Sequence, residues 1–269
     1  MKIFDTHAHY YDRKFEALEG GVDALLSSDE IKDTVRGIIN IGANYDTSRR
    51  CMEFAEKYDF MYCAVGIHPS DAQNPDICKL TPKEEVERIR SLVDTKEKRE
   101  KSKIVAIGEI GFDYYWQPVN RELQYEYFDL QMQLARELDL PVVIHDREAH
   151  GDTFDMILKY PEVRGVIHSC SLSAEMARDL ARRGWYISFS GTVTFKNAQK
   201  VKEACAAIPI DKLLSETDAP YLAPHPKRGS LNNSALMKYT VSEIAELHNM
   251  SFDEMAEKLY MNAKELFKL

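Results

Sequence analysis

Short apolar runs alternate along the chain with longer segments of helical character. The runs are rich in β-branched and aliphatic residues, and polar or turn-forming residues bound them, which is typical of strands. We expect strands at residues 2–7, 35–42, 60–67, 103–110, 141–145, 164–168, 184–190 and 213–217. Because a helical segment follows each run, the pattern predicts eight β/α units.

Several of the helical segments carry signals for where a helix begins or ends. Residues 120–139 form the clearest predicted helix, because apolar residues recur there at helical spacing and Pro141 follows. Residues 81–101 should form a helix that opens with a capping box at Thr81 and a proline at the first helical position. Further helices are expected at residues 46–58 with Asp46 as N-cap, 173–183, 197–208, and twice within 234–269.

Eight alternating units predict the (β/α)8 TIM-barrel fold, since right-handed parallel crossovers close such a series most simply. A doubly wound open sheet is the runner-up. No fixed-period repeat and no Gly/Ser-rich or Pro-rich linker divides the chain, so we expect a single domain over residues 1–269. In the barrel fold, active sites lie at the carboxyl ends of the strands, and chemically competent side chains should gather there.

Ionisable side chains lie at the carboxyl ends of five of the predicted strands, directly after an apolar run. A charged group at the end of a packed strand is costly unless it is paired or metal-bound, and five at one rim are hard to explain by packing. The first is a His-x-His pair, whose period of two places both imidazoles on one strand face. Alone, that pair could equally be two ordinary strand histidines. The full set is His7, His9, Glu109, His145, His168 and Asp218.

Four histidines and two carboxylates exceed the ligands of one tetrahedral zinc site, so the set predicts two divalent metal ions. Asp218 and Glu109 are the expected catalytic carboxylates, and Asp218 could accept a proton from a water between the ions. Histidine-rich ligands favour zinc, while the carboxylates also admit manganese or magnesium. We assign one ion to His7, His9 and Asp218, the other to His145 and His168, and the bridging position to Glu109.

Composition narrows the class of protein. A net charge of −9 opposes strong non-specific binding to nucleic-acid backbones or anionic membranes, so a phosphate-bearing substrate would need local cations or metal ions. The five scattered cysteines argue against a disulfide framework and predict reduced, mostly buried thiols. Without a bilayer-length apolar run or a signal-like segment, we expect a cytosolic protein with no membrane partner. Nothing indicates an obligate protein partner.

Six segments in the chain carry a family resemblance. They are residues 5–9 (DTHAH), 66–69 (GIHP), 108–114 (GEIGFDY), 144–147 (IHDR), 216–222 (ETDAPYL) and 228–229 (RG). Their combination and order resemble the TatD family of metal-dependent hydrolases, within the amidohydrolase superfamily. The resemblance implies a TIM barrel, a binuclear divalent-metal centre and metal-dependent DNase activity, described as 3′-to-5′ exonuclease activity on single-stranded DNA. Two loops, residues 169–173 and 230–234, depart from the family pattern but leave the ligand positions intact.

Other residues near the strand ends could contact a substrate. His68 could hold a scissile phosphate as a cation, or could be a turn histidine before Pro69, and both interpretations stay open. Arg147 and Arg228 could donate to phosphate oxygens, although a surface ion pair is the commoner role for an arginine. The aromatic residues 114–116 could stack an unpaired base, but we expect at least two of them to pack in the core.

The sequence therefore predicts a metal-dependent hydrolase of phosphodiester bonds, with DNA as the expected substrate and a metal-bound hydroxide as nucleophile. One alternative keeps the metal centre but changes the bond, giving an esterase, amidase, lactonase or phosphotriesterase. Another is a non-catalytic metal-binding protein. The large ligand set argues against the second alternative, because structural zinc sites are usually closed by four ligands.

Overall fold

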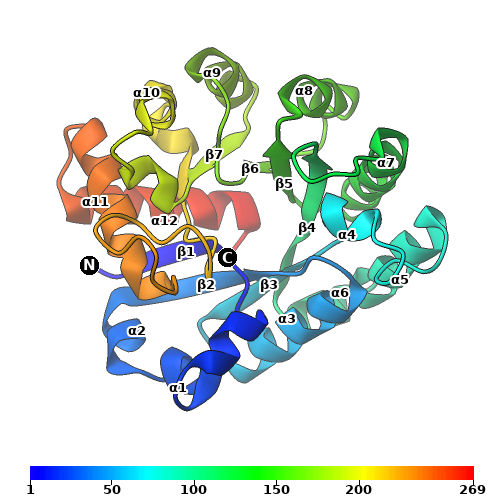
Figure 1. Cartoon of the computed structure of the whole chain (residues 1–269), viewed down its shortest axis with the longest axis horizontal. Helices are drawn as coiled ribbons and strands as arrows, with labels where there is room; N and C mark the ends of the chain where they lie inside the picture. The colour runs from blue at the N-terminus through cyan, green and yellow to red at the C-terminus, as the bar shows by residue number, and fades with distance from the viewer. The chain divides into compact units, whose positions relative to one another are not determined.

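The computed structural model describes all of residues 1–269 and contains eight parallel strands in the order β1 to β8, with helices between them (Figure 1). This order is that of a (β/α)8 barrel, so the predicted fold class is confirmed. The strands are β1 (Ile3–Ala8), β2 (Val35–Ile41), β3 (Met61–Val65), β4 (Ile104–Asp113), β5 (Val142–Arg147), β6 (Gly165–Ile167), β7 (Tyr186–Phe189) and β8 (Leu213–Ser215).

Twelve α-helices and four short 3-10 helices connect or follow these strands. The α-helices are α1 (Gly21–Leu26), α2 (Asp29–Thr34), α3 (Tyr45–Lys57), α4 (Pro69–Ala72), α5 (Pro82–Val93), α6 (Lys96–Lys101), α7 (Arg121–Leu138), α8 (His150–Lys159), α9 (Ala174–Arg182), α10 (Gln199–Ala207), α11 (Met237–Leu247) and α12 (Phe252–Phe267). The 3-10 helices are η1 (Arg13–Ala17), η2 (Gly191–Thr194), η3 (Ile210–Lys212) and η4 (Ser234–Leu236).

The chain divides into two compact units. The first unit joins both ends of the chain, Met1–Asn40 and His168–Leu269, and the second is Ile41–Ile167. In the first, β1 pairs with β2, β7 pairs with β8, and α12 packs against β1 and β8. In the second, β3, β4, β5 and β6 pair in succession. Helix α3 packs against β3, and α7 packs against β4. The single domain over 1–269 stays a prediction.

Most strand residues are buried, as expected for the apolar runs of parallel strands. β4 is longer than expected, because it runs to Asp113 and stays paired with β5 as far as Arg147. All five cysteines are free thiols and four of them are buried, which agrees with the prediction. No helix combines the length and the hydrophobicity that crossing a bilayer requires.

Helix caps confirm most of the predicted starts. Thr81 and Glu84 form the predicted capping box at the start of α5, with Pro82 at the first helical position. The prediction of Asp46 as an N-cap was wrong: Asn44 caps α3, and its side chain accepts a hydrogen bond from the backbone N–H of Thr47. Asn44 and Asp46 both carry a side-chain oxygen that can cap a helix, so the sequence alone did not decide between them.

The helix expected over residues 81–101 is two helices. α5 ends at Val93, and α6 begins at Lys96 with Thr95 as its N-cap. The Thr95 side chain accepts a hydrogen bond from the backbone N–H of Lys98. Threonine competes for backbone donors in this way, and here the competition restarts the helix after a short break.

Candidate metal centre

The first group of candidate ligands lies in the unit that contains both ends of the chain. His7 is on β1, His9 follows the end of that strand, and Asp218 lies three residues beyond β8. The Nε2 atoms of His7 and His9 are 3.0 Å apart. Asp218 Oδ1 lies 3.7 Å from Nε2 of His7 and 3.3 Å from Nε2 of His9. Three ligand atoms therefore lie within 4.8 Å of one another, and their role as metal ligands stays a prediction.

The spacing of these three atoms fits a metal ion. Bonds of about 2.0–2.2 Å at tetrahedral angles place zinc ligands about 3.3–3.6 Å from one another. The three separations of 3.0, 3.3 and 3.7 Å bracket that value. Two imidazoles and one carboxylate also match the donor types that zinc and manganese accept. The chemistry of the donor set thus suits a divalent cation.

The backbone holds Asp218 in an uncommon conformation. Its φ is +58°, in the left-handed region, where aspartate is tolerated better than most residues. Its N–H donates to the carbonyl of His7 at 2.9 Å, and its carbonyl accepts from the N–H of Tyr221 at 2.8 Å. Burial alone would raise the pKa of Asp218, but the hydrogen bond with His9 and the surrounding imidazoles bring it below its ordinary value. Asp218 is therefore ionised at neutral pH.

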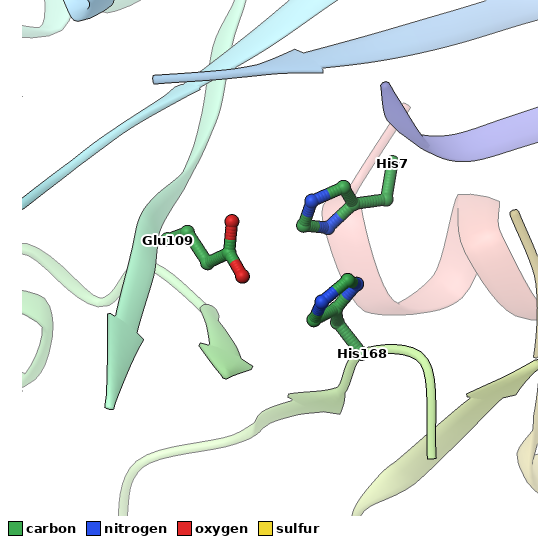
Figure 2. A group of neighbouring side chains, drawn as sticks. All are labelled: His7, Glu109 and His168. Carbon is green, nitrogen blue, oxygen red and sulfur yellow. The ribbon is translucent and has the colours of Figure 1, made fainter. Parts of the chain in front are cut away.

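His168 belongs to the same unit and stacks on His7, with ring centroids 3.9 Å apart and an interplanar angle of 20° (Figure 2). Its Nδ1 donates to Oε1 of Glu216 at 2.8 Å, and the same oxygen accepts from the N–H of Ser169 at 2.8 Å. Glu216 is buried. Such a carboxylate fixes the tautomer of His168 and leaves Nε2 to act as a metal ligand.

A buried aspartate ties β1 to the segment after β8. Asp5 accepts hydrogen bonds from the N–H and hydroxyl of Thr217 at 2.9 and 2.6 Å, and from the hydroxyl of Ser234 at 2.6 Å. It also accepts from the N–H of His7 at 3.2 Å. Burial raises the pKa of Asp5 to about 6 against these bonds. Because Asp5 binds residues next to both His7 and Asp218, it sets the position of one ligand relative to the other.

The second group lies in the unit formed by residues 41–167. Glu109 extends from β4 (Figure 2). Its Oε1 lies 2.9 Å from Nδ1 of His145 and 3.7 Å from Nε2 of His68. The Glu109 N–H donates to the carbonyl of Gly42 at 2.9 Å. A Cβ on Gly108 would lie 2.7 Å from Cβ of Val143, so the absence of a side chain lets β4 press against β5 and brings Glu109 beside His145.

His145 is held between two carboxylates. Its Nδ1 faces Glu109, and its Nε2 donates to Oδ2 of Asp113 at 3.0 Å. Burial would raise the pKa of Asp113, but the hydrogen bond and charge of His145 and two backbone N–H donors bring it below its ordinary value. Asp113 thus orients the His145 ring so that Nδ1 is the atom offered to a metal ion. Sequence reasoning missed this role, although Glu109 and Asp113 share one strand face by their spacing of four.

His68 fits both interpretations that the sequence left open. It is the N-cap of α4, and its Nδ1 accepts a hydrogen bond from the backbone N–H of Ser70 at 3.1 Å. Its Nε2 meanwhile faces Glu109, and its ring centroid lies 4.3 Å from that of His145. His68, Glu109 and His145 place three ligand atoms within 4.8 Å of one another. His68 could therefore ligate a metal as well as contact substrate, and its role in binding substrate stays a prediction.

The predicted substrate-binding arginines lie against aromatic rings. The guanidinium carbon of Arg147 is 3.9 Å from the ring centroid of Tyr115, and that of Arg228 is 4.2 Å from the centroid of Phe195. The expectation that at least two of residues 114–116 pack in the core was wrong. Tyr115 and Trp116 are exposed, and only Tyr114 is partly covered. The cluster follows the end of β4, where the chain leaves the strand and its rings no longer face the interior.

Comparison with known proteins assigns this chain to a family. The family described as "TatD related DNase" matches residues 4–268. This chain belongs to the TatD family. Among its TatD relatives, an uncharacterized metal-dependent hydrolase, YabD of Bacillus subtilis (strain 168), is 40% identical over 99% of both chains. The uncharacterized metal-dependent hydrolase YcfH of Escherichia coli (strain K12) is 32% identical over 100% of this chain and 97% of that one.

A solved structure agrees with the family assignment. The TatD homolog YJJV from Escherichia coli K12 superposes with a TM-score of 0.86 and 28% identity, covering 99% of this chain and 98% of that chain. This TatD protein is therefore a metal-dependent hydrolase with a (β/α)8 barrel fold. Its His, Asp and Glu side chains at the strand ends are the candidate ligands for the metal on which that activity depends.

Proposed function

We propose that this TatD protein hydrolyses phosphodiester bonds in DNA, as a 3′-to-5′ exonuclease on single strands or frayed ends. The observation that carries the proposal is that each unit offers a group of three ligand atoms, and each group combines imidazoles with a carboxylate. Such groups suit divalent metal ions, and such ions stabilise the attacking and leaving oxygens of a phosphoryl centre. The family description as DNase-related supports DNA as the substrate.

The proposed centre holds two divalent ions, with zinc favoured and manganese or magnesium as the alternatives. The sequence assignment is kept as the proposal: His7, His9 and Asp218 would hold one ion, His145 and His168 the other, and Glu109 would bridge them, while His68 would bind substrate. Bound ions of this kind lower the pKa of a coordinated water and polarise phosphoryl oxygens. Glu109 and Asp218 supply the negative charge that offsets the two cations.

Side chains of the protein would accept the proton, position the ligands and bind the phosphates. Asp218, ionised at neutral pH, accepts the proton released when water attacks phosphorus. Glu216 and Asp113 hold the rings of His168 and His145 in place through their hydrogen bonds. His68, Arg147 and Arg228 would neutralise phosphate oxygens of the strand, which a chain of net charge −9 needs near its site. A cytosolic location remains part of the proposal.

The test is an activity panel with the purified, metal-loaded protein. The panel compares a 3′-labelled and a 5′-labelled single-stranded oligonucleotide with carboxylester, lactone, amide and phosphotriester substrates. The proposal predicts stepwise loss of nucleotides from the 3′ end and little turnover of the other classes. Turnover confined to the other classes would replace the nuclease by a different hydrolase with the same ligands.

Variants separate catalysis from simple metal binding. Asp218→Asn keeps the size of the side chain but removes its charge, and we expect it to lower kcat at least about 100-fold, within the range for losing general-base catalysis. Asp253→Asn is the matched control, because Asp253 is an exposed aspartate of the same unit, paired with the amino terminus. Unchanged hydrolysis by Asp218→Asn would favour a protein that binds metal without using it.

A further inference from the structure

Two large aromatic side chains stand exposed just beyond the end of β4. Tyr115 is 45% exposed and Trp116 is 56% exposed, and their ring centroids lie 4.9 Å apart in an edge-to-face arrangement at 87°. Tryptophan is usually well buried, because its large ring gains more than most from leaving water. An exposed pair of this size therefore marks a surface that is available to a planar ligand.

A cation lies on the same surface. Arg147 is the last residue of β5, and its guanidinium carbon is 3.9 Å from the ring centroid of Tyr115 and 5.5 Å from that of Trp116. The Arg147 side chain is itself exposed. A flat apolar ring beside a cation matches the two parts of a nucleotide, a base that stacks and a phosphate that accepts hydrogen bonds. The positive charge is local in a chain of net charge −9.

The surface is fixed relative to the second ligand group. One oxygen of Asp113, Oδ1, accepts hydrogen bonds from the backbone N–H groups of Tyr115 at 3.0 Å and Trp116 at 3.3 Å. Its other oxygen, Oδ2, holds Nε2 of His145 at 3.0 Å. The Tyr114 N–H also donates to the carbonyl of Arg147 at 2.9 Å. One buried carboxylate thus connects the aromatic pair to a candidate metal ligand.

We propose that Tyr115, Trp116 and Arg147 form a nucleobase subsite for the strand that is cleaved. An unpaired base stacks on the exposed ring of Trp116, and Arg147, held over Tyr115, binds a phosphate of the same strand. The subsite rests on the proposed nuclease function, and it adds that unpaired bases contribute to binding. A duplex keeps its bases stacked on one another, so the subsite favours single strands and frayed ends.

Tryptophan fluorescence tests the subsite directly, because the chain has only two tryptophans. Trp185 is buried at 4% exposure, so Trp185→Phe leaves Trp116 as the single reporter. The metal-loaded protein is titrated with phosphorothioate-linked hexathymidylate, which resists hydrolysis, and with an abasic strand of the same linkage and length. We expect saturable quenching by the thymidylate and a Kd about 5- to 100-fold lower than for the abasic strand.

Substitutions assign the effect to the ring. In Trp116→Ala, measured by fluorescence anisotropy of labelled strands, the preference for the thymidylate over the abasic strand should be lost, and Trp116→Phe should retain part of it. Tyr125→Ala should keep the full preference. Tyr125 is the matched control because it is 46% exposed and has a cation, Lys159, 5.3 Å from its ring centroid, but lies on α7. Equal preference in Trp116→Ala and the wild type would overturn the subsite.

The outcomes separate this inference from the proposed function. A preference for bases that disappears in Trp116→Ala, in a protein that hydrolyses no phosphodiester, would support the subsite and overturn the nuclease. Hydrolysis of single-stranded DNA with no preference for thymidylate over the abasic strand would support the nuclease and overturn the subsite. Capture of a protein on this surface, with no effect of either strand on Trp116 fluorescence, would also overturn the nucleobase subsite.

Discussion

Glu216 offers a test of how the centre is built, because it contacts a candidate ligand without being one. Its Oε1 accepts hydrogen bonds from Nδ1 of His168 and from the N–H of Ser169, both at 2.8 Å, in a buried position. Glu216→Gln preserves the shape of the side chain and one carbonyl acceptor but removes the negative charge. The His168 ring would then be held less firmly, and its Nε2 would be a weaker ligand.

The expected magnitude follows from these two contacts. A hydrogen bond to a charged acceptor contributes about 1 kcal/mol more than one to a neutral acceptor, so two bonds together lose about 2 kcal/mol. Loss of a carboxylate behind a metal-bound histidine weakens metal affinity about 10- to 100-fold, which corresponds to about 1.4–2.7 kcal/mol. The first figure is a cost in folding stability, and the second sets the metal affinity, so we expect Glu216→Gln to raise the Kd for Mn²⁺ by about 30-fold, near the middle of that range.

Isothermal titration of the metal-free protein with Mn²⁺ measures this change. Glu85→Gln is the matched control. Glu85 is also a buried carboxylate, and its Oε1 accepts from the N–H groups of Lys79 and Leu80 at 3.0 and 3.2 Å, but it lies on α5. Glu85→Gln should lower the free energy of unfolding and leave the Kd for Mn²⁺ within about twofold of wild type. If both variants bind Mn²⁺ equally well, Glu216 does not support a metal ligand and the reasoning fails.

Three further predictions concern the backbone, pH and the metal. Gly111 has φ +140°, and a Cβ there would lie 2.0 Å from the carbonyl oxygen of His145, whereas Gly184 has φ +94° and no atom within 4 Å of the added Cβ. In urea unfolding, Gly111→Ala should therefore lower the free energy of unfolding by about 2–5 kcal/mol, and Gly184→Ala by about 1–2 kcal/mol. The hydrogen bond to Asp146 raises the pKa of His150, so its stabilisation is complete below pH 6.5 and lost as pH rises through the raised pKa. The wild-type advantage over His150→Gln in unfolding free energy should therefore shrink between pH 5 and 9, and a constant difference would contradict this. Removal of metal with EDTA should lower the Tm, and added Mn²⁺ should restore it; an unchanged Tm would argue against a site formed in the folded state.

The sequence predicted the strands of this protein more completely than its loops. Apolar runs bounded by polar or turn-forming residues located all eight strands. The His-x-His spacing, which depends only on local backbone geometry, agrees with the 3.0 Å separation of the His7 and His9 Nε2 atoms. Asp113 was missed because β4 was expected to end at residue 110, which hid its shared face with Glu109. Pairing with β5 extends that strand, and such pairing is not encoded in one segment alone.

Loops and caps were harder to predict because their conformation depends on contacts that are distant in sequence. Tyr115 and Trp116 have large aromatic side chains but are exposed, because their backbone N–H groups donate to Asp113 beyond the end of β4. The left-handed conformation of Asp218 depends on a hydrogen bond with His7, more than two hundred residues away in the chain. Glu216 likewise acts through a distant contact, since its Oε1 accepts a hydrogen bond from Nδ1 of His168, 48 residues earlier in the chain.

Metal-soaked crystals test most directly the proposal that His, Asp and Glu side chains at the strand ends bind two divalent ions. Anomalous diffraction at the Mn or Zn edge, together with elemental analysis, gives the number and positions of the ions. We expect two ions per chain, one bound by His7, His9 and Asp218 and one by His145 and His168, with Glu109 contacting both. No anomalous density at these residues, or a Glu109 or Asp218 side chain turned away from the ions, would contradict it.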